Sequence, residues 1–217
     1  MKPAQGILFD VIGTTVLEKN SETIVNCLTE AFAVNGIFIT RDRIQPHRGK
    51  DKMQMIGSIL GQHGHNLPPS TIYLEFRKQF IKNLNEFTLA AGADEVFQQL
   101  KGKGIMIGLG SGLSKDLFNL LFDHLNLHTY SFDYTCVSEE VGRPRPYPDM
   151  ILHMIDRLSL DSKSFLKVGD SLADIEEGKN AGVRTAVILT GTQSAERLIA
   201  AKPDYALQCI VEVMAIV

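Results

Sequence analysis

Continuous runs of apolar residues recur along the chain, separated by longer stretches in which apolar residues follow a helical spacing. A strand that is apolar at every position is buried on both faces, as in parallel sheets covered by helices on both sides. The helical stretches are long enough to join parallel strands as crossovers. We therefore predict an α/β fold with a doubly wound, Rossmann-like parallel sheet of five to six strands, at residues 6–9, 104–110, 132–137, 165–169, 184–189 and, as a short sixth, 204–207.

The stretch between the first and second predicted strands has only helical patterns, such as SETIVNCLTEAFAVNG and STIYLEFRKQFIKNL, and no strand-like run. It is too long for one crossover. We predict a small, all-helical cap domain inserted at residues 17–86, with residues 1–16 and 87–217 forming the core. The polar stretch at 61–70 is expected to be a loop between cap helices, and its His-x-His pair to be only part of that loop.

Composition limits the possible partners of this 217-residue chain, which is 44% hydrophobic and 22% charged. A net charge of -3 gives no basic surface for nucleic acid, and no apolar run approaches the roughly 18 residues of a membrane span. The first residues show no secretory signal, so we expect a cytoplasmic protein. Its three separated cysteines indicate neither a disulfide framework nor a zinc cluster and are expected to be core thiols.

Polar residues follow the ends of several predicted strands. Asp10 ends the first strand, Ser111 follows the second, and Asp170 and Asp174 follow a later one. In open parallel sheets the ligand site lies beyond the carboxyl ends of the strands, so these oxygens are expected to converge. An oxygen-rich cluster suits Mg²⁺ and a phosphate that it would carry.

One basic residue outside the strand ends is expected near this cluster. Arg143, in the loop after the third strand, adds a positive charge, whereas Arg145 and Lys50 are expected to face solvent.

Four segments together resemble the haloacid dehalogenase superfamily of aspartate-nucleophile hydrolases. They are FDVIGTTV, the turn at Ser111, GRPRPYPDM and VGDSLADIEEGKNAG, and their order and spacing are similar to those of the family's four motifs. The helical insert falls where the family has its cap domain. The resemblance covers nearly the whole chain and implies a hydrolase.

The resemblance implies a role for each matching residue. Asp10 would attack phosphorus to give an aspartyl-phosphate, and Ser111 and Arg143 would bind the phosphoryl oxygens. Asp10 and Asp170 would hold Mg²⁺, with Asp174 as a further ligand or acting through water. The implied contacts also include the backbone carbonyl of Ile12 for the metal and Thr14, Arg48 and Gly112 for the substrate.

Ile12 departs from the family pattern, because phosphatases of this superfamily usually have an acid-base Asp there. The phosphonoacetaldehyde hydrolase (phosphonatase)-like branch tolerates this loss, and the chain resembles it in Gly-Thr-Thr-Val, in Gly-Arg-Pro and in the form of LTGTQSAERL. In that branch a cap lysine forms a Schiff base with the substrate aldehyde. The carbon part of the substrate therefore leaves as an enamine and needs no acid at position 12. By resemblance Lys52 is that lysine.

Several alternatives remain open from the sequence. Lys52 forms a Schiff base, binds a second anionic group, or is a solvated cap lysine. The chain is a magnesium-dependent hydrolase of a small phosphonate or phosphate metabolite, a phosphomonoesterase similar to phosphoglycolate phosphatase, or a binding or regulatory protein with impaired catalysis. We expect a monomer or homodimer.

Overall fold

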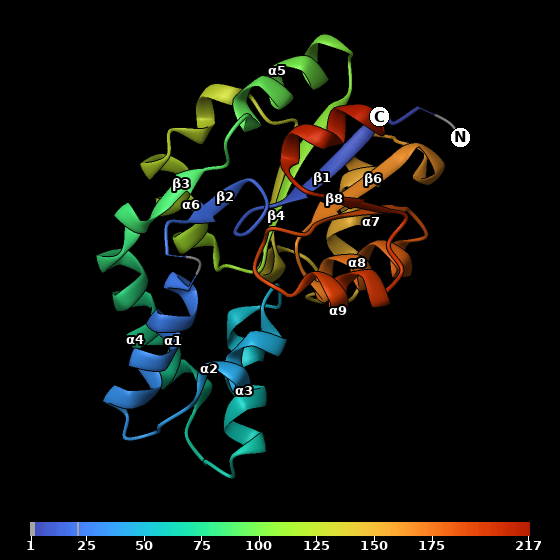
Figure 1. Cartoon of the computed structure of the whole chain (residues 1–217). Helices are drawn as coiled ribbons and strands as arrows, with labels where there is room; N and C mark the ends of the chain where they lie inside the picture. The colour runs from blue at the N-terminus through green and yellow to red at the C-terminus, as the bar shows by residue number, and fades with distance from the viewer. Residues whose placement is uncertain (1–2, 21) are drawn as a thin grey trace.

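Six parallel strands form one sheet in the order β5-β4-β1-β6-β7-β8, which confirms the predicted α/β fold (Figure 1). The computed structural model describes residues 3–20 and 22–217. The strands of this sheet are β1 (Gly6–Asp10), β4 (Met106–Ser111), β5 (Tyr134–Val137), β6 (Phe165–Gly169), β7 (Arg184–Ile188) and β8 (Tyr205–Leu207). Each overlaps a run that the sequence identified.

Helices cover both faces of this sheet. In β1, Ile7 and Phe9 belong to one buried cluster and Leu8 belongs to another. The first cluster includes Phe97, whose ring centroid lies 5.7 Å from that of Phe9. Burial on both faces explains why the strand is apolar at successive positions. The helices that follow the insert are α5 (Ala93–Gly102), α6 (Lys115–His124), α7 (Asp149–Arg157), α8 (Leu172–Ala181) and α9 (Ala195–Ala200), with short 3₁₀ turns η3 (Leu127–Tyr130), η4 (Ser138–Glu140), η5 (Ser162–Ser164) and η6 (Ile210–Ala215).

The segment between β1 and β4 contains the inserted helices and one feature that the sequence missed. Two three-residue strands, β2 (Val16–Glu18) and β3 (Phe87–Leu89), pair antiparallel where the chain enters and leaves the insert. Strands this short leave no recognisable period, so the expectation of no strand here was wrong. We call residues 19–86 the cap. The cap has the elements α1 (Thr23–Val34), α2 (Arg41–Ile44), η1 (Gln45–His47), α3 (Lys52–Gln62), α4 (Pro69–Lys82) and η2 (Leu84–Glu86).

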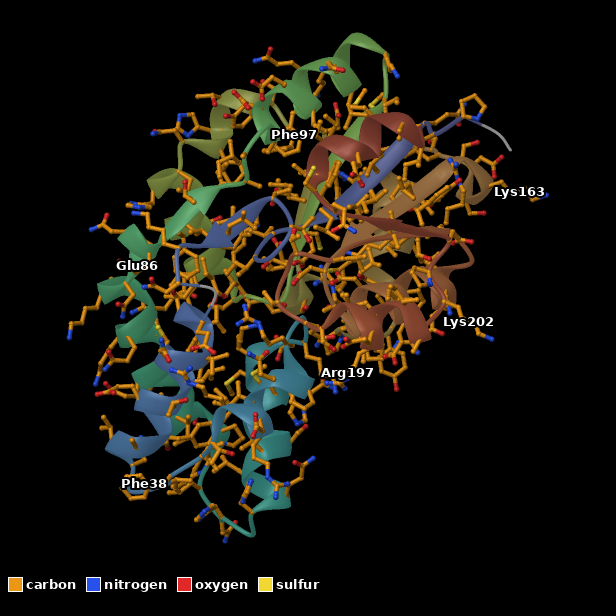
Figure 2. All side chains as sticks on the ribbon, in the orientation of Figure 1. Phe38, Glu86, Phe97, Lys163, Arg197 and Lys202 are labelled. Atoms are coloured by element: carbon orange, nitrogen blue, oxygen red, sulfur yellow. The ribbon has the colours of Figure 1, made fainter. Side chains whose placement is uncertain are left out.

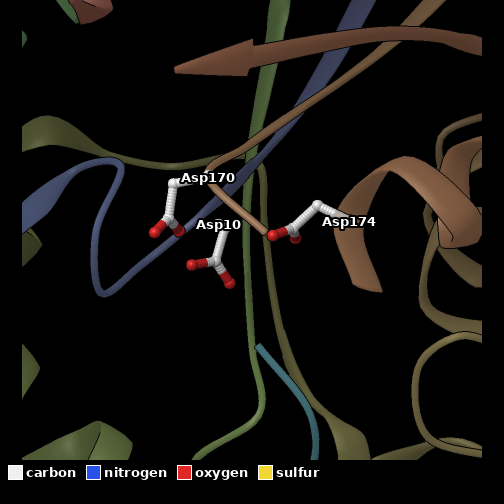
Figure 3. Close-up of side chains that lie close together, drawn as sticks. All are labelled: Asp10, Asp170 and Asp174. Atoms are coloured by element: carbon white, nitrogen blue, oxygen red, sulfur yellow. The ribbon is translucent and has the colours of Figure 1, made fainter. Parts of the chain in front are cut away.

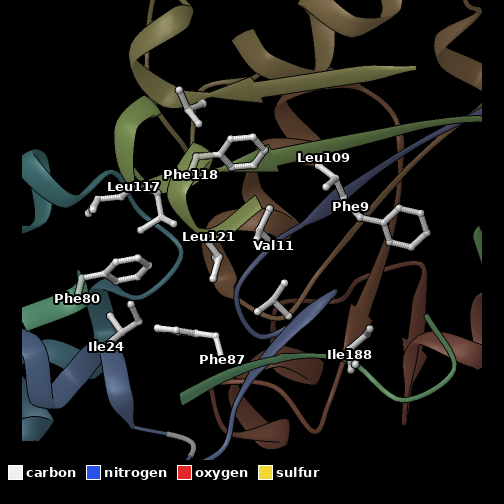
Figure 4. Close-up of a cluster of buried hydrophobic side chains, with 14 of the residues drawn as sticks. Phe9, Val11, Ile24, Phe80, Phe87, Leu109, Leu117, Phe118, Leu121 and Ile188 are labelled. Carbon is white, nitrogen blue, oxygen red and sulfur yellow. The ribbon is translucent and has the colours of Figure 1, made fainter. Parts of the chain in front are cut away.

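One hydrophobic cluster extends from the sheet into the cap (Figure 4). Phe9 and Leu109 of the sheet belong to the same buried cluster as Ile24 of α1 and Phe80 of α4. Helix α4 also contacts α6, where Arg77 Nε lies 2.5 Å from Asp116 Oδ2. The cap therefore packs on the core beside the carboxyl ends of the strands. The division into two domains at residues 17–86 stays a prediction.

The outer surface of the cap carries little that bears on the site. Phe38 is 87% exposed and lies near the end of the cap far from the sheet (Figure 2). His63 and His65 are exposed and lie in the loop between α3 and α4, as expected. Cys27 and Cys136 are buried as expected, whereas Cys209 is exposed, so the prediction of a core thiol was wrong there. Within the described residues, no helix is long and apolar enough to cross a membrane.

Candidate active site

Three buried aspartates converge at the carboxyl ends of β1 and β6 (Figure 3). Asp10 is the last residue of β1, Asp170 follows β6, and Asp174 lies in the first turn of α8. One carboxylate oxygen of each lies within 4.8 Å of the others. Because β1 and β6 are neighbours in a parallel sheet, their ends bring Asp10 and Asp170 together across 160 residues of sequence.

Asp170 is held by amide and hydroxyl groups. The backbone N–H of Thr192 donates to its Oδ2 at 2.6 Å, and the Thr192 hydroxyl donates to the same oxygen. The Thr14 hydroxyl lies 3.5 Å from Oδ1. Gly13, with φ of +102°, lies so close that a Cβ there would overlap the carboxylate. Thr14 thus contacts a proposed metal ligand, and its expected contact with the substrate stays a prediction.

Burial and mutual repulsion raise the pKa values of two of these three carboxylates. Burial, followed by the nearby Asp10 and Asp174 charges, raises the pKa of Asp170 to about 7. Burial and Asp174 likewise raise the pKa of Asp10. For Asp174, Lys167 and Arg145 outweigh burial and lower the pKa. Two buried carboxylates that resist ionisation side by side fit a divalent cation with oxygen ligands, because its charge would offset their repulsion.

The guanidinium at the site belongs to Arg145 and not to Arg143. Arg145 is fully buried, and its Nη1 donates to Asp10 Oδ1 at 2.5 Å while its Nη2 donates to Gly110 O at 2.8 Å. Its Nε lies 3.0 Å from Glu177 Oε2. The prediction that Arg145 faces solvent was therefore wrong.

Arg143 lies outside the site, on the exposed surface. Its Nη2 donates to Asp149 Oδ1 at 3.0 Å, and its guanidinium lies 4.5 Å from the centroid of the Tyr147 ring. The expected contact of Arg143 with substrate is corrected by this placement. Arg-Pro-Arg-Pro offers two arginines two residues apart, and Arg145 is the one that turns inward.

Two further charged residues of the site were missed. Lys167 in the middle of β6 is fully buried, and its Nζ lies 2.9 Å from Asp174 Oδ1 and 3.4 Å from Glu177 Oε2. Glu177, also fully buried, thereby contacts both Lys167 and Arg145. A lysine inside the otherwise apolar run FLKVG was the available signal, because a fully buried lysine requires a counter-charge.

Ser111 and Gly112 form the side of the site next to β1. Ser111 is buried at the end of β4, adjacent in the sheet to Asp10, and its Oγ accepts from Leu113 N at 3.1 Å. A Cβ at Gly112 would lie 2.6 Å from the carbonyl oxygen of Lys50 in the cap. Gly112 therefore permits the close approach of the cap to the core.

The cap loop before α3 covers this cluster. The carbonyl of Gly49 lies 3.3 Å from Arg145 Nη1, and a cavity of about 30 Å³ remains between loop and core. That volume has room for roughly two water molecules. The lining residues are Asp10, Ile12, Ile24, Arg48, Gly49, Lys52, Ser111, Gly112, Leu113, Arg145 and Thr192.

Lys52 and Arg48 have different surroundings within this loop. Lys52 is the first residue of α3 and is 7% exposed, and its Nζ donates to Lys50 O at 3.2 Å. Burial and the nearby Arg48 charge lower the pKa of Lys52 to about 8. Arg48 is engaged by the buried carboxylate of Glu18. Ile12 lines the cavity and offers no proton-transfer group.

Comparisons with known proteins agree with this arrangement. The family model described as Haloacid dehalogenase-like hydrolase matches residues 7–188. The chain is 26% identical over 203 residues to the phosphonoacetaldehyde hydrolase of Bacillus cytotoxicus. This alignment covers 87% of this chain and 76% of that protein. It is 27% identical over 203 residues to a bifunctional phosphonoacetaldehyde hydrolase/aminoethylphosphonate transaminase of Clostridioides difficile, covering 87% of this chain but only 32% of that protein.

Solved structures share the fold. The structure of a phosphonoacetaldehyde hydrolase like protein from Oleispira antarctica has a TM-score of 0.88 at 22% identity, covering 99% of this chain and 91% of that one. A haloacid dehalogenase-like hydrolase from Bacteroides fragilis has a TM-score of 0.84 at 24% identity, covering 97% and 99% of the two chains.

Proposed function

The chain belongs to the haloacid dehalogenase-like hydrolase family, as its four motifs predicted, and on this premise we propose that it hydrolyses a small phosphonate through an aspartyl-phosphate on Asp10. Asp10 and Asp170 would hold Mg²⁺, with Asp174 beside them. When bound, the metal would supply positive charge to the phosphonate oxygens and to the carboxylates. The phosphonatase-like relatives support phosphonate as the substrate class.

The residues around Asp10 support its role as the nucleophile. Arg145 Nη1 fixes one oxygen of the Asp10 carboxylate, and the Thr15 hydroxyl donates to the Asp10 backbone oxygen at 3.0 Å. Attack of the Asp10 carboxylate on phosphorus would form the aspartyl-phosphate while the P–C bond breaks. Arg145 and the Ser111 hydroxyl would bind the transferring oxygens, and water would then release phosphate and regenerate Asp10.

Lys52 would accept the carbon part of the substrate. A neutral Lys52 amine would attack the aldehyde carbonyl of phosphonoacetaldehyde, lose water, and form an imine. The imine would be protonated on nitrogen, so that when the P–C bond breaks its electron pair would neutralise this cation and give an enamine on Lys52. Protonation at carbon and hydrolysis of the imine would then release acetaldehyde and the free amine. No acid at position 12 is needed on this route.

The observation that carries the proposal is the meeting of Lys52 and Asp10 in one cavity beside Ile12. The amine is buried and its pKa is lowered to about 8, so a substantial fraction is neutral near pH 8. An ordinary phosphomonoesterase would have no use for such an amine and would lack its acid at Ile12.

Phosphate release from a substrate panel tests the proposal. The panel contains phosphonoacetaldehyde, phosphoglycolate, sugar phosphates and an activated aryl phosphate, each assayed with Mg²⁺ and with EDTA. We expect turnover of phosphonoacetaldehyde that EDTA abolishes. Turnover of phosphoglycolate alone would favour the phosphatase alternative, and no turnover of any compound would favour a binding or regulatory protein. Full turnover in EDTA would contradict the metal assignment.

The remaining assignments are also proposals. We propose that the protein acts in the cytoplasm, as a monomer or homodimer, on a small metabolite and not on nucleic acid. The net charge of -3 supports the last point.

A further inference from the structure

Three basic residues of the cap loop stand near the site in sequence, but they do not contribute equally. Arg48 and Lys52 line the cavity with their side chains. Lys50 contributes its carbonyl oxygen, which faces Gly112 and accepts from Lys52 Nζ. The cap therefore brings two cationic side chains to the leaving-group side of the cavity.

Glu18 removes the net charge of one of them. Glu18 is the last residue of β2, and its two carboxylate oxygens face the two Nη atoms of Arg48, with Nη1 and Oε2 3.4 Å apart. The Arg48 side chain is 4% exposed and that of Glu18 is 1% exposed. A two-pronged pair of this kind uses the hydrogen-bonding fork of the guanidinium that would otherwise bind an anion.

The position of Glu18 in its strand shows that this pairing is built in. In β2, Val16 and Glu18 are buried and Leu17 between them is partly exposed. The inward positions of such a strand normally take apolar residues, and a carboxylate buried there is costly unless it is paired. Arg48, 30 residues further along the chain, supplies the compensating charge.

Little positive charge then remains for a second anion on the substrate. Arg145 and Lys167 on the core side are already matched by Asp174 and Glu177. On the cap side, among the described lining residues, Lys52 keeps an unmatched charge, and it would lose that charge as an attacking amine. The other walls near the cap are apolar: Ile12, Ile24 and Leu113.

We infer that Glu18 sets the substrate class of this site: by neutralising Arg48, it restricts the leaving part of the substrate to groups without a second negative charge. This inference rests on the proposed function, because it takes the phosphonate group to lie at Asp10. Arg48 then acts as a structural partner of Glu18 and not as the substrate-binding residue that the sequence indicated.

Two unreactive probes of matched shape test this inference by equilibrium binding. Phosphonoacetamide carries a neutral tail and phosphonoacetate carries a carboxylate tail. Their dissociation constants are measured by calorimetry with Mg²⁺ for the natural sequence, Glu18→Gln, Arg48→Met and the double variant. Glu86→Gln is the matched control, because Glu86 is a half-buried acid next to β3 that does not line the cavity.

Near pH 9, above the pKa of about 8 for Lys52, most of the Lys52 amine is neutral, and the natural sequence is expected to bind phosphonoacetamide more tightly. Glu18→Gln exposes the Arg48 charge and should shift the affinity ratio toward phosphonoacetate by about tenfold or more, the order expected for one unit charge at close range. Arg48→Met should shift the ratio the other way, the double variant should have the ratio of the natural sequence, and Glu86→Gln should leave that ratio unchanged. If Glu18→Gln does not fold, Arg48→Met and the double variant still give different predictions, a shifted ratio for the first and the natural ratio for the second.

Two results would contradict these expectations in distinguishable ways. An affinity ratio that stays within about twofold in Glu18→Gln and Arg48→Met, while both probes bind, would overturn the role of Glu18 and leave the proposed function intact. Failure of both probes to bind the natural sequence with Mg²⁺ would overturn the phosphonate site itself, and with it this inference.

Discussion

The charged groups that would act on the two parts of the substrate differ in how tightly they are held. On the core side, Arg145 contacts Asp10, Asp174 and Glu177, and Lys167 contacts the last two. On the cap side, Lys52 donates to the carbonyl of Lys50. A fixed charge network suits phosphoryl transfer, in which the same oxygens are always stabilised, whereas a lightly held amine can form and release a covalent bond.

This difference indicates a division of labour. The core side would supply the step shared by the family, and the cap side would determine which leaving group can depart. Changes on the core side should then affect every substrate equally, and changes on the cap side should affect substrates selectively.

Replacing the nucleophile should have the largest effect. Asp10→Asn keeps the shape of the side chain but removes the attacking oxygen's charge, so turnover of every substrate should fall by at least ~10⁴-fold. Phosphate release measures this loss, and circular dichroism checks that the fold is retained. Activity within tenfold of the natural sequence would show that the nucleophile lies elsewhere.

The two arginines of GRPRPYPDM offer the next test. Arg145→Lys keeps the charge but removes the fork that reaches Asp10 and Gly110 together, so kcat should fall by ~10²-fold on all substrates. Arg143→Lys is the matched control and should stay within about twofold, because Arg143 contacts Asp149 on the surface. Equal losses of kcat in both variants would contradict the assignment of the site guanidinium to Arg145 alone.

These residues also show what the sequence can reveal. The six strands were identifiable because each is a continuous apolar run, and three carboxylates were identifiable because they follow strand ends. Arg145 was not, since the choice between two arginines depends on which one the loop turns inward. The partner of Arg48 was not identifiable either, because Glu18 meets it only through the folded cap.

A difference on the cap side should be visible in stability. The pKa of Lys52 falls from 10.5 to about 8 on folding, so between these pH values the unfolded chain binds more protons and stability rises with pH. Below about pH 8 the folded chain carries the full cost of the buried charge. Lys52→Met should therefore raise the free energy of unfolding at pH 7 by about 1–3 kcal/mol.

Denaturant unfolding of Lys52→Met and the natural sequence at pH 7 and pH 9.5 measures this effect. The gain in the free energy of unfolding should shrink at the higher pH. Lys50→Met should show no such gain, because the Lys50 side chain is less buried. A Lys52→Met variant that is less stable at pH 7 would contradict the buried, weakly partnered amine.

The smallest expected effect is at Ile12. Ile12→Asp introduces the missing proton-transfer group and should raise kcat/KM for a phosphate ester by about tenfold. This gain is smaller than the ~10²- to 10⁴-fold that a well-positioned acid-base group contributes, because the surrounding residues are not arranged for it. Turnover of phosphonoacetaldehyde should not rise, because the enamine needs no acid. A comparable gain in kcat/KM on both substrates would contradict the claim that the enamine route needs no acid at position 12.

Trapping of the covalent intermediate tests the central claim most directly. The protein is treated with borohydride in the presence of phosphonoacetaldehyde and Mg²⁺, and peptides are analysed by mass spectrometry. Our account predicts loss of activity and a stable mass increment on Lys52, with Lys50 and Lys167 unmodified, and no trapping in Lys52→Arg. Full turnover of phosphonoacetaldehyde without any adduct on Lys52, retained in Lys52→Arg, would contradict it.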